Sequence, residues 1–353
     1  MAATLDKEFF GKTSKGEDIY KFTFTNGNNV SISILNFGCV VYEINLPDKD
    51  GNVTDVNLGF DNVTDYEVNN NYFGALCGRV ANRIGGAEMT IDGVQYKLSR
   101  NDPLGGHICH GGSVGFSRRV WDYEIKDEKL TLSYKDADGS EGFPGDVTTH
   151  VTFSLDSENT LTMDYVASTN KPTVVDMGSH FMVNLGGHDK GPIRDHVITI
   201  ASDKYLDIGK DFLPSGKTIS VEDDKIMDFR SPRDLCGETL EKMSGECAFH
   251  HAFRFDKRGE RKLMARVDHP PSKRFMEVYS TNTTVFAYSN HFMDVIVGDK
   301  PCKGGVVYQK YGAIEFMPMG YPNSIKMPDF PQSVLRPGEE YHEVACYKFG
   351  VAE

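Results

Sequence analysis

The sequence predicts an all-β protein built as a large antiparallel β-sandwich. Short segments rich in Val, Ile, Thr, Tyr and Phe recur along the chain, with Gly, Asn and Asp between them, and the 353 residues include 35 glycines. No segment keeps a 3.6-residue apolar period for more than about three turns. These two observations favour long twisted sheets packed face to face over layers of helices.

The clearest strand signals lie near the start of the chain. Asn26-Gly27-Asn28-Asn29 is a strong hairpin turn, and residues 30–34 after it alternate strictly between apolar and polar side chains. A second strand is expected over residues 39–46, which the turn formers of residues 47–52 close. Residues 91–94 form another predicted turn between two strand-like runs. These turns indicate hairpins of neighbouring strands.

Six further strands are predicted in the rest of the chain. They are residues 129–134, 147–155, 160–166, 196–201, 275–279 and 284–288. One brief helix is expected over residues 231–243, where Pro232 follows a possible Ser cap. No Pro/Ser-rich tract, charge block or change in composition divides the sequence, so residues 1–353 are expected to form a single domain.

Composition excludes several classes of partner. A hydrophobic content of 39% is enough for a large core, and a net charge of −13 disfavours nucleic acid and anionic membrane surfaces. No segment approaches the roughly 20 apolar residues that span a bilayer, and the N-terminal residues lack a secretory signal pattern. The seven cysteines include no C-x-x-C pair, which suits free thiols in a reducing compartment. We therefore expect a cytoplasmic protein.

One histidine stands at the end of a predicted strand. His180 lies between two apolar runs within residues 174–187, and an imidazole can gain or lose a proton near neutral pH. The alternative, and the commoner outcome for a lone histidine, is a core residue whose two nitrogens are satisfied by neighbours. Other polar clusters in the chain favour the functional interpretation.

Two Gly-rich segments carry further candidates. Residues 77–86 contain Asn82 and Arg83, and arginine offers a rigid fork of donors to hydroxyl or carboxylate oxygens; the alternative is a surface loop with salt-bridged arginines. Residues 105–112 contain His107 and His110 at a spacing that resembles metal ligands. No cysteine pair or carboxylate completes a metal set there, so a histidine that faces a ligand is the favoured interpretation.

A glutamate inside an apolar run is the last candidate. Burial of Glu315 among residues 313–318 would raise its pKa toward the useful range of a general base, whereas the competing interpretation is a structural ion pair with an arginine. Residues 138–145 are dense in turn formers and are expected to be architectural. Nucleophile-elbow, zinc-protease, P-loop and dinucleotide-binding motifs are absent.

Taken in order, these segments resemble the aldose 1-epimerase (galactose mutarotase) family. The resemblance runs nearly end to end and rests on residues 78–84, 110–112 with 115–116, 138–145, His180 with Asn184 and Leu185, Glu315, and the tail 335–349. It implies a galactose mutarotase-like β-sandwich that interconverts the α and β anomers of a free hexose without a cofactor or metal. The expected partner is thus a small-molecule sugar, bound by a monomer or weak dimer.

The resemblance also implies residue roles. Glu315 would be the base that takes the proton from the C1 hydroxyl, and His180 would be the acid that protonates the ring oxygen. The ring then opens, the C1–C2 bond rotates, and closure on the other face reverses both transfers. Asn82, Arg83 and His110 fall on positions that bind the sugar.

Several positions depart from the family pattern. His250 stands where the family usually has an aspartate, and Phe286 and Met317 stand where it has glutamines. We therefore expect that the proton-transfer pair is kept while sugar specificity is altered. Two alternatives stay open: an epimerase for hexose 6-phosphates, in which His250, His251 and Arg254 bind an anion, and a sugar-binding homologue without turnover.

Overall fold

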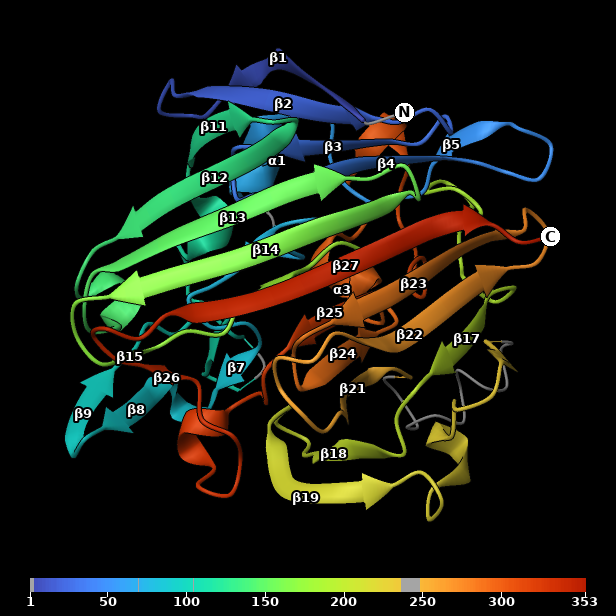
Figure 1. The fold of residues 1–353 in the computed structure, drawn as a ribbon. Coiled ribbons are helices and arrows are strands. Elements are labelled where there is room, and N and C mark those ends of the chain that lie inside the picture. The colour runs from blue at the N-terminus through green and yellow to red at the C-terminus, as the bar shows by residue number, and fades with distance from the viewer. Residues whose placement is uncertain (1–2, 69, 104, 236–247) are drawn as a thin grey trace.

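A nine-stranded antiparallel sheet crosses the whole molecule (Figure 1). The computed structural model describes residues 3–68, 70–103, 105–235 and 248–353. In spatial order the strands are β11 (Asp122–Lys126), β12 (Lys129–Asp136), β13 (Val147–Leu155), β14 (Thr160–Thr169), β27 (Tyr341–Val351), β23 (Arg274–Ser280), β22 (Lys262–His269), β17 (Val197–Ile200) and β20 (Arg233–Asp234). The last strand along the chain, β27, lies between β14 and β23, so the sheet joins distant parts of the sequence.

One face of this sheet packs into the largest hydrophobic cluster. Buried and less buried residues alternate along β13, where Val147, Val151 and Phe153 point into the core. This two-residue period is that of a strand with one packed face. Phe22 and Phe24 from a second sheet belong to the same cluster. The predicted antiparallel sandwich is confirmed.

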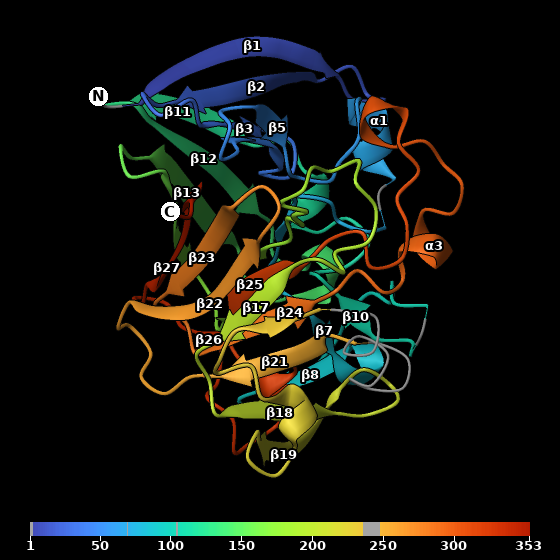
Figure 2. The same cartoon turned by 90° about the vertical axis from the view of Figure 1, so that its right-hand side faces the viewer.

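The second sheet follows the order of the sequence (Figure 2). Its strands are β1 (Thr4–Lys12), β2 (Asp18–Thr25), β3 (Ser31–Leu35), β4 (Val41–Pro47) and β5 (Val53–Asp55). At the predicted turn, the Asn26 amide donates to the Val30 carbonyl at 3.1 Å, and Asn26 Oδ1 accepts from the Asn28 amide at 3.0 Å. The predicted hairpin between β2 and β3 is therefore present.

A third sheet lies at the opposite end of the molecule from β1 and β2 (Figure 2). Its strands, in spatial order, are β19 (Pro214–Ser220), β18 (Lys204–Ile208), β21 (His250–Arg254), β24 (Thr284–Tyr288) and β25 (Glu315–Met319). Every residue of β24 and β25 is buried, so other elements cover both faces of these two strands. This sheet carries the candidate base.

Four two-stranded ladders organise the loops beside the third sheet. They are β6 (Leu76–Cys77) with β16 (Gly178–Ser179), β7 (Arg83–Ile84) with β10 (Ile108–Cys109), β8 (Glu88–Ile91) with β9 (Val94–Lys97), and β15 (Thr173–Val174) with β26 (Val334–Leu335). The first two ladders bring together segments that the sequence separates by up to about a hundred residues, and both position candidate site residues.

Helices are short and few in the described part of the chain. They comprise α1 (Val63–Glu67) and α3 (Met293–Ile296), with 3₁₀ turns η1 (Gly85–Ala87), η2 (Phe116–Arg118), η3 (Ser140–Gly142), η4 (Lys225–Met227), η5 (Lys303–Gly305) and η6 (Ser324–Lys326). Among described residues, no helix is long and apolar enough to cross a membrane.

The prediction of a helix over residues 231–243 is wrong at its start. Arg233 and Asp234 instead form β20, which pairs with β17, and the Leu235 amide donates to the His196 carbonyl at 2.9 Å. Pairing with an existing sheet edge satisfies these backbone groups and outweighs the local Ser–Pro signal. Residues 236–243 lie outside the described part of the chain.

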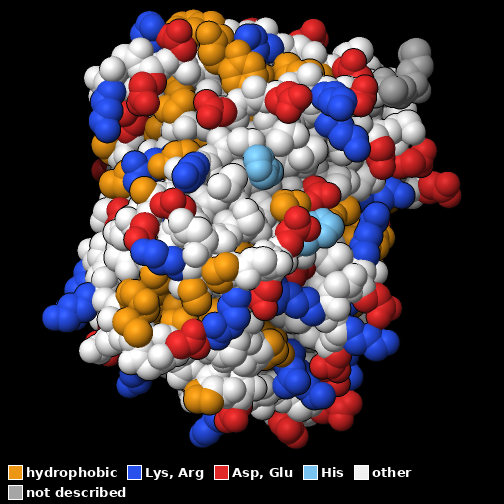
Figure 3. Space-filling view, turned by 60° about the vertical axis from the view of Figure 1, so that its left-hand side comes forward, with side chains coloured by type: hydrophobic (Ala, Val, Ile, Leu, Met, Phe, Trp, Pro, Cys, Tyr) orange, Lys and Arg blue, Asp and Glu red, His pale blue; other side chains and the backbone are white. Residues whose placement is uncertain are grey.

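The face drawn in Figure 3 mixes basic and acidic side chains. No continuous basic surface covers this face, so it offers no track for a polyanion backbone.

Candidate active site

A cavity of about 470 Å³ opens between the third sheet and the loops around β7 and β10. One wall is polar and contains Asn82, Arg83, Asn101, Asp102, His110 and His180. A second wall, contributed by the third sheet and the segment around α3 (Met293–Ile296), contains His250, Phe286, Tyr288, Phe292, Ile296 and Met317. The volume falls within the range of small-molecule sites, which combine apolar lining with a few convergent polar groups.

Backbone hydrogen bonds hold His180 in place directly after β16. The His180 amide donates to the Ala75 carbonyl at 2.8 Å, and its carbonyl accepts from the Gly74 amide at 3.0 Å. The imidazole lines the cavity and is 7% exposed. Burial lowers the pKa of His180 to about 4.

Glu315 approaches His180 from the third sheet. It is the first residue of β25, pairs with Tyr288 of β24, and places Oε2 3.5 Å from His180 Nε2. Neither carboxylate oxygen accepts a hydrogen bond from a described residue, and burial raises the pKa of this carboxyl well above its usual value. No arginine pairs with Glu315 among the described residues, so the structural ion pair weighed from the sequence is not found.

The pair is buried more deeply than the cavity surface. Among described residues, His180 lines the cavity but Glu315 does not, and both Glu315 oxygens are covered. Because burial opposes charge on each partner, the pair favours a carboxylic acid beside a neutral imidazole. That state holds the same single proton as a carboxylate beside an imidazolium, so the pair can exchange forms without taking a proton from solvent.

A tight loop fixes the orientation of His110. His110 Nδ1 accepts a hydrogen bond from the Asn82 amide at 3.3 Å, and the His110 amide donates to the Asn82 carbonyl at 2.9 Å. Burial lowers the pKa of His110 well below its usual value, and the nearby imidazole of His180 adds to the effect. The neutral ring therefore carries its proton on Nε2, where it can donate to a ligand oxygen.

Gly111 makes this loop possible, and its replacement by alanine is expected to destabilise the protein. Gly111 has φ +85°, and a Cβ there would lie 1.8 Å from the Gly78 carbonyl oxygen. Gly93 has a similar φ of +80° with open space around it, so Gly93→Ala is the matched control for backbone strain alone. We expect Gly111→Ala to cost at least about 2 kcal/mol more than Gly93→Ala in urea denaturation. Equal losses would contradict the close approach.

Two buried arginines have separate partners. Arg83 Nε donates to Asp102 Oδ2 at 2.6 Å beside the cavity. Arg79 is 1% exposed, pairs with Asp136 at 2.6 Å, and donates to the Pro144 carbonyl at 2.9 Å. The surface-loop alternative for these arginines is therefore wrong, and Arg79 anchors the loop of residues 138–145.

The structure brings the predicted site residues together. Asn82, Arg83, His110 and His180 line one cavity, with Glu315 against His180. His107 does not line it; its Nδ1 accepts from the Gly86 amide at 3.1 Å. Sequence reasoning missed several lining residues: Asn70, Asn71, Tyr72, Asn101 and Asp102. These residues carry only local turn signals, which predict loops but not which loops meet at the cavity.

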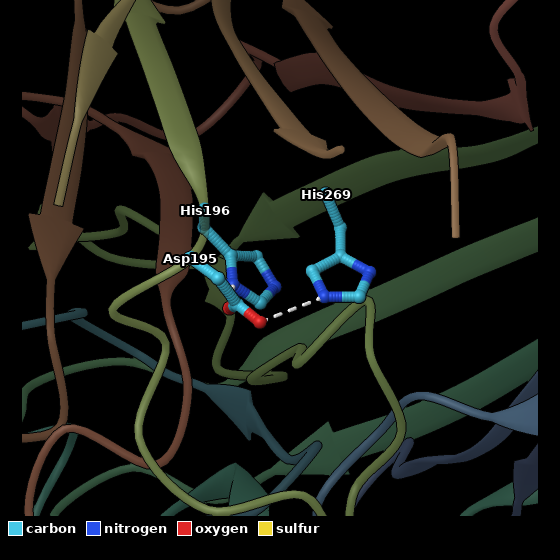
Figure 4. Close-up of side chains that lie close together, drawn as sticks. All are labelled: Asp195, His196 and His269. Atoms are coloured by element: carbon cyan, nitrogen blue, oxygen red, sulfur yellow. Dashed lines mark hydrogen bonds and ion pairs between the residues drawn. The ribbon is translucent and has the colours of Figure 1, made fainter. Parts of the chain in front are cut away.

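A separate cluster joins Asp195, His196 and His269 (Figure 4). Among described residues these three form the one group whose potential metal-ligand atoms all lie within 4.8 Å. Asp195 Oδ1 lies 2.9 Å from His196 Nδ1, and Oδ2 lies 3.0 Å from His269 Nε2. His196 Nε2 accepts from the Leu185 amide at 3.0 Å, which places the proton of the neutral ring on Nδ1.

This tautomer leaves His196 no free lone pair for a metal. The cluster instead ties Leu185, five residues after His180, to strands β17 and β22. We expect dialysis against EDTA to leave both the melting temperature and the catalytic activity unchanged. Loss of either property that zinc restores would contradict this structural role and would reopen the metal interpretation of His107 and His110.

Comparison with known proteins identifies the family. A family model described as aldose 1-epimerase matches residues 20–348. The chain belongs to the aldose 1-epimerase family. Galactose mutarotase of Rattus norvegicus is 33% identical over 350 residues, covering 99% of each chain, and that of Homo sapiens is 33% identical over 351 residues, covering 99% of this chain and all of the relative. The aldose 1-epimerase of Escherichia coli K12 is 29% identical over 343 residues, covering 95% of this chain and 96% of the relative.

Solved structures of this family share the fold. An aldose epimerase homologue from C. elegans and a galactose 1-epimerase from Lactobacillus acidophilus each give a TM-score of 0.83 over the whole of both chains, at 23% and 22% identity. The family resemblance read from the sequence is confirmed. In this family member, the three departures noted in the sequence, His250, Phe286 and Met317, all line the cavity.

Proposed function

We propose that this chain is an aldose 1-epimerase, an isomerase of carbohydrate metabolism that interconverts the anomers of a free hexose without a cofactor. The observation that carries the proposal is the His180–Glu315 pair, 3.5 Å apart beside a sugar-sized cavity. The C1 hydroxyl and the ring oxygen are bonded to the same carbon, so the acid and base that serve them must both reach the same end of the sugar.

In the proposed reaction, one proton enters the sugar and one leaves it. The Glu315 carboxylate takes the proton of the C1 hydroxyl while the His180 imidazolium protonates the ring oxygen, and the C1–O bond of the ring breaks to give the open aldehyde. After rotation about C1–C2, the O5 hydroxyl attacks the other face of the C1 carbonyl and forms the new C1–O5 bond. The carboxylic acid of Glu315 gives its proton to the carbonyl oxygen, the neutral imidazole of His180 takes the proton of O5, and both side chains return to their starting forms. A positioned acid or base of this kind typically supplies about 10²–10⁴-fold acceleration.

Asn82, Arg83 and His110 are proposed to hold the sugar hydroxyls. The Nε2 proton of His110 and the Arg83 guanidinium are donors on the same wall as His180. Donors fixed in advance orient the ring and stabilise negative charge as it develops on oxygen.

The cavity gives no support to a phosphorylated substrate. Arg83 is the one cation among the described lining residues, and Asp102 already neutralises it. His251 packs against Tyr205 with ring centroids 5.4 Å apart, and the Arg254 guanidinium lies over the Tyr321 ring instead of the cavity.

The test is polarimetry on freshly dissolved α-D-glucose and α-D-galactose. Faster approach to the equilibrium rotation than in buffer supports the proposal, and an unchanged rate with both sugars contradicts it.

A cytoplasmic location fits the five free buried cysteines of the described chain. A single domain and a monomeric or weakly dimeric state remain predictions. Cooperative unfolding in calorimetry tests the first, and sedimentation tests the second.

A further inference from the structure

The two walls of the cavity have opposite chemistry. The wall that holds His180 offers amide, guanidinium and imidazole groups to a sugar. A second wall, contributed by the third sheet and the segment around α3, consists chiefly of aromatic and thioether side chains, with Phe286 4% exposed and Met317 fully buried. It adjoins the first wall where Arg83 Nη1 lies 3.5 Å from His250 Nε2, so a sugar in the cavity meets polar groups over one part of its surface and an apolar row over another.

The register of the third sheet explains the second wall. His250, Tyr288 and Glu315 lie directly opposite one another on β21, β24 and β25, so their side chains share one face of the sheet. The next row on that face is Ala252, Phe286 and Met317. Because same-face rows are two residues apart, this apolar row lies only about 7 Å from the row of the candidate base.

The Tyr288 hydroxyl and His250 Nε2 of this wall already have partners. The Tyr288 hydroxyl accepts a hydrogen bond from the Phe292 amide at 3.2 Å. His250 Nε2 lies 3.5 Å from Arg83 Nη1, and since arginine only donates, this nitrogen accepts. Its ring packs edge-on among Phe212, Phe286 and Tyr288, with centroids 5.0, 5.1 and 5.7 Å away.

His250 therefore behaves as part of an apolar wall. Burial and the neighbouring Arg83 charge lower its pKa well below the usual value, so the ring is neutral. Its remaining nitrogen, Nδ1, is covered and makes no hydrogen bond to a described residue. A sugar hydroxyl placed against Phe286 or Met317 would find no acceptor within this part of the described cavity.

We propose that the preferred substrate is a deoxy aldose, which presents a C–H or methyl group where the Phe286–Met317 row meets the ring. The proposal rests on the epimerase function proposed above and adds its substrate class. A hydroxyl at that place loses its water partners and gains none, whereas a methyl or methylene group gains buried contact. Sites of this kind distinguish a single group by about 10-fold to 200-fold in kcat/KM.

The test compares matched sugar pairs with the wild-type protein. The pairs are D-galactose with 6-deoxy-D-galactose and D-glucose with 2-deoxy-D-glucose, each followed by polarimetry and expressed as kcat/KM relative to the uncatalysed rate. We expect the deoxy member to exceed its parent by about tenfold or more in at least one pair, equivalent to about 1.4 kcal/mol. The pair that responds identifies the sugar edge that meets the wall.

Two variants check the assigned row. Met317→Gln has nearly the same shape and adds an amide acceptor and donor, so it is expected to reduce the deoxy preference at least threefold. Met317→Leu keeps the wall apolar and is expected to retain it. Parent sugars equal to or better than both deoxy sugars, with clear acceleration, would overturn this inference alone. No acceleration of any of the four sugars would overturn the epimerase function itself.

Discussion

Replacing Glu315 with glutamine is expected to lower the turnover number about 100-fold or more while changing sugar affinity much less. The amide keeps the shape of the side chain but cannot take the proton of the C1 hydroxyl. Glu315 is 1% exposed, and its Oε2 lies 3.5 Å from His180 Nε2. A base that acts only as the bond breaks affects kcat and kcat/KM together.

The measurement is initial-rate polarimetry over a range of sugar concentrations. Glu343→Gln is the matched control, because Glu343 is also buried (2% exposed) but pairs with Arg258 and accepts from Thr281 Oγ1 at 2.6 Å, away from the cavity. We expect that control to keep kcat within about threefold. His180→Asn is expected to lose turnover on the same scale as Glu315→Gln. Wild-type turnover in Glu315→Gln would remove the proposed role of this carboxyl.

Stability is expected to peak near pH 6.5 and to fall steeply in acid. Four imidazoles, those of His110, His180, His196 and His250, are more than nine-tenths buried, and burial lowers the pKa of each. Two buried carboxyls shift the other way: burial raises the pKa of Asp176 to about 7 and that of Glu315 well above its usual value.

The sign of the effect follows from the protons bound in each state. Below pH 6.5 the unfolded chain protonates its histidines, whereas the folded protein keeps these four neutral, so their contribution to stability is lost as the pH falls. Asp176 and Glu315 oppose this, because burial raises the pKa of both carboxyls, and below about pH 7 the folded protein keeps a proton on Asp176 that the unfolded chain releases. The imidazoles outnumber these carboxyls, and burial also lowers the pKa of His251 to about 4, so unfolding takes up protons overall and stability falls as the pH decreases.

Urea denaturation between pH 4.5 and 8 measures this dependence. The Asp176→Asn variant is the matched control, because an asparagine oxygen can still accept from the Gly320 amide, which donates to Asp176 Oδ1 at 2.8 Å. Without this carboxyl, unfolding in acid is expected to take up about one more proton. The free energy of unfolding should then fall more steeply below pH 6.5 and more gradually above it. A denaturation midpoint that stays constant from pH 7 to pH 5 would contradict the neutral state of the buried imidazoles.

Local patterns in the sequence predicted many of the strands. The alternation in residues 147–155 and the apolar run 284–288 coincide with β13 and β24. Whether a strand buries one face or both is visible in the pattern of its own residues. The expected helix at residues 231–243 fails where β20 begins, since pairing with β17 depends on a segment elsewhere in the chain. Local sequence patterns predict an element correctly only when pairing with a distant segment does not override the intrinsic secondary-structure preference of its residues.

The sequence by itself determined the fold class, the family and the candidate proton-transfer residues, because alternation and motif order are local properties. Only the tertiary structure decided that Glu315 lies against His180 with its oxygens covered, and that His250, Phe286 and Met317 share one wall of the cavity. These facts depend on the register of β21, β24 and β25 and on loops that meet across the molecule. Burial, which sets the pKa of the pair and the chemistry of the wall, exists only after distant segments have packed together.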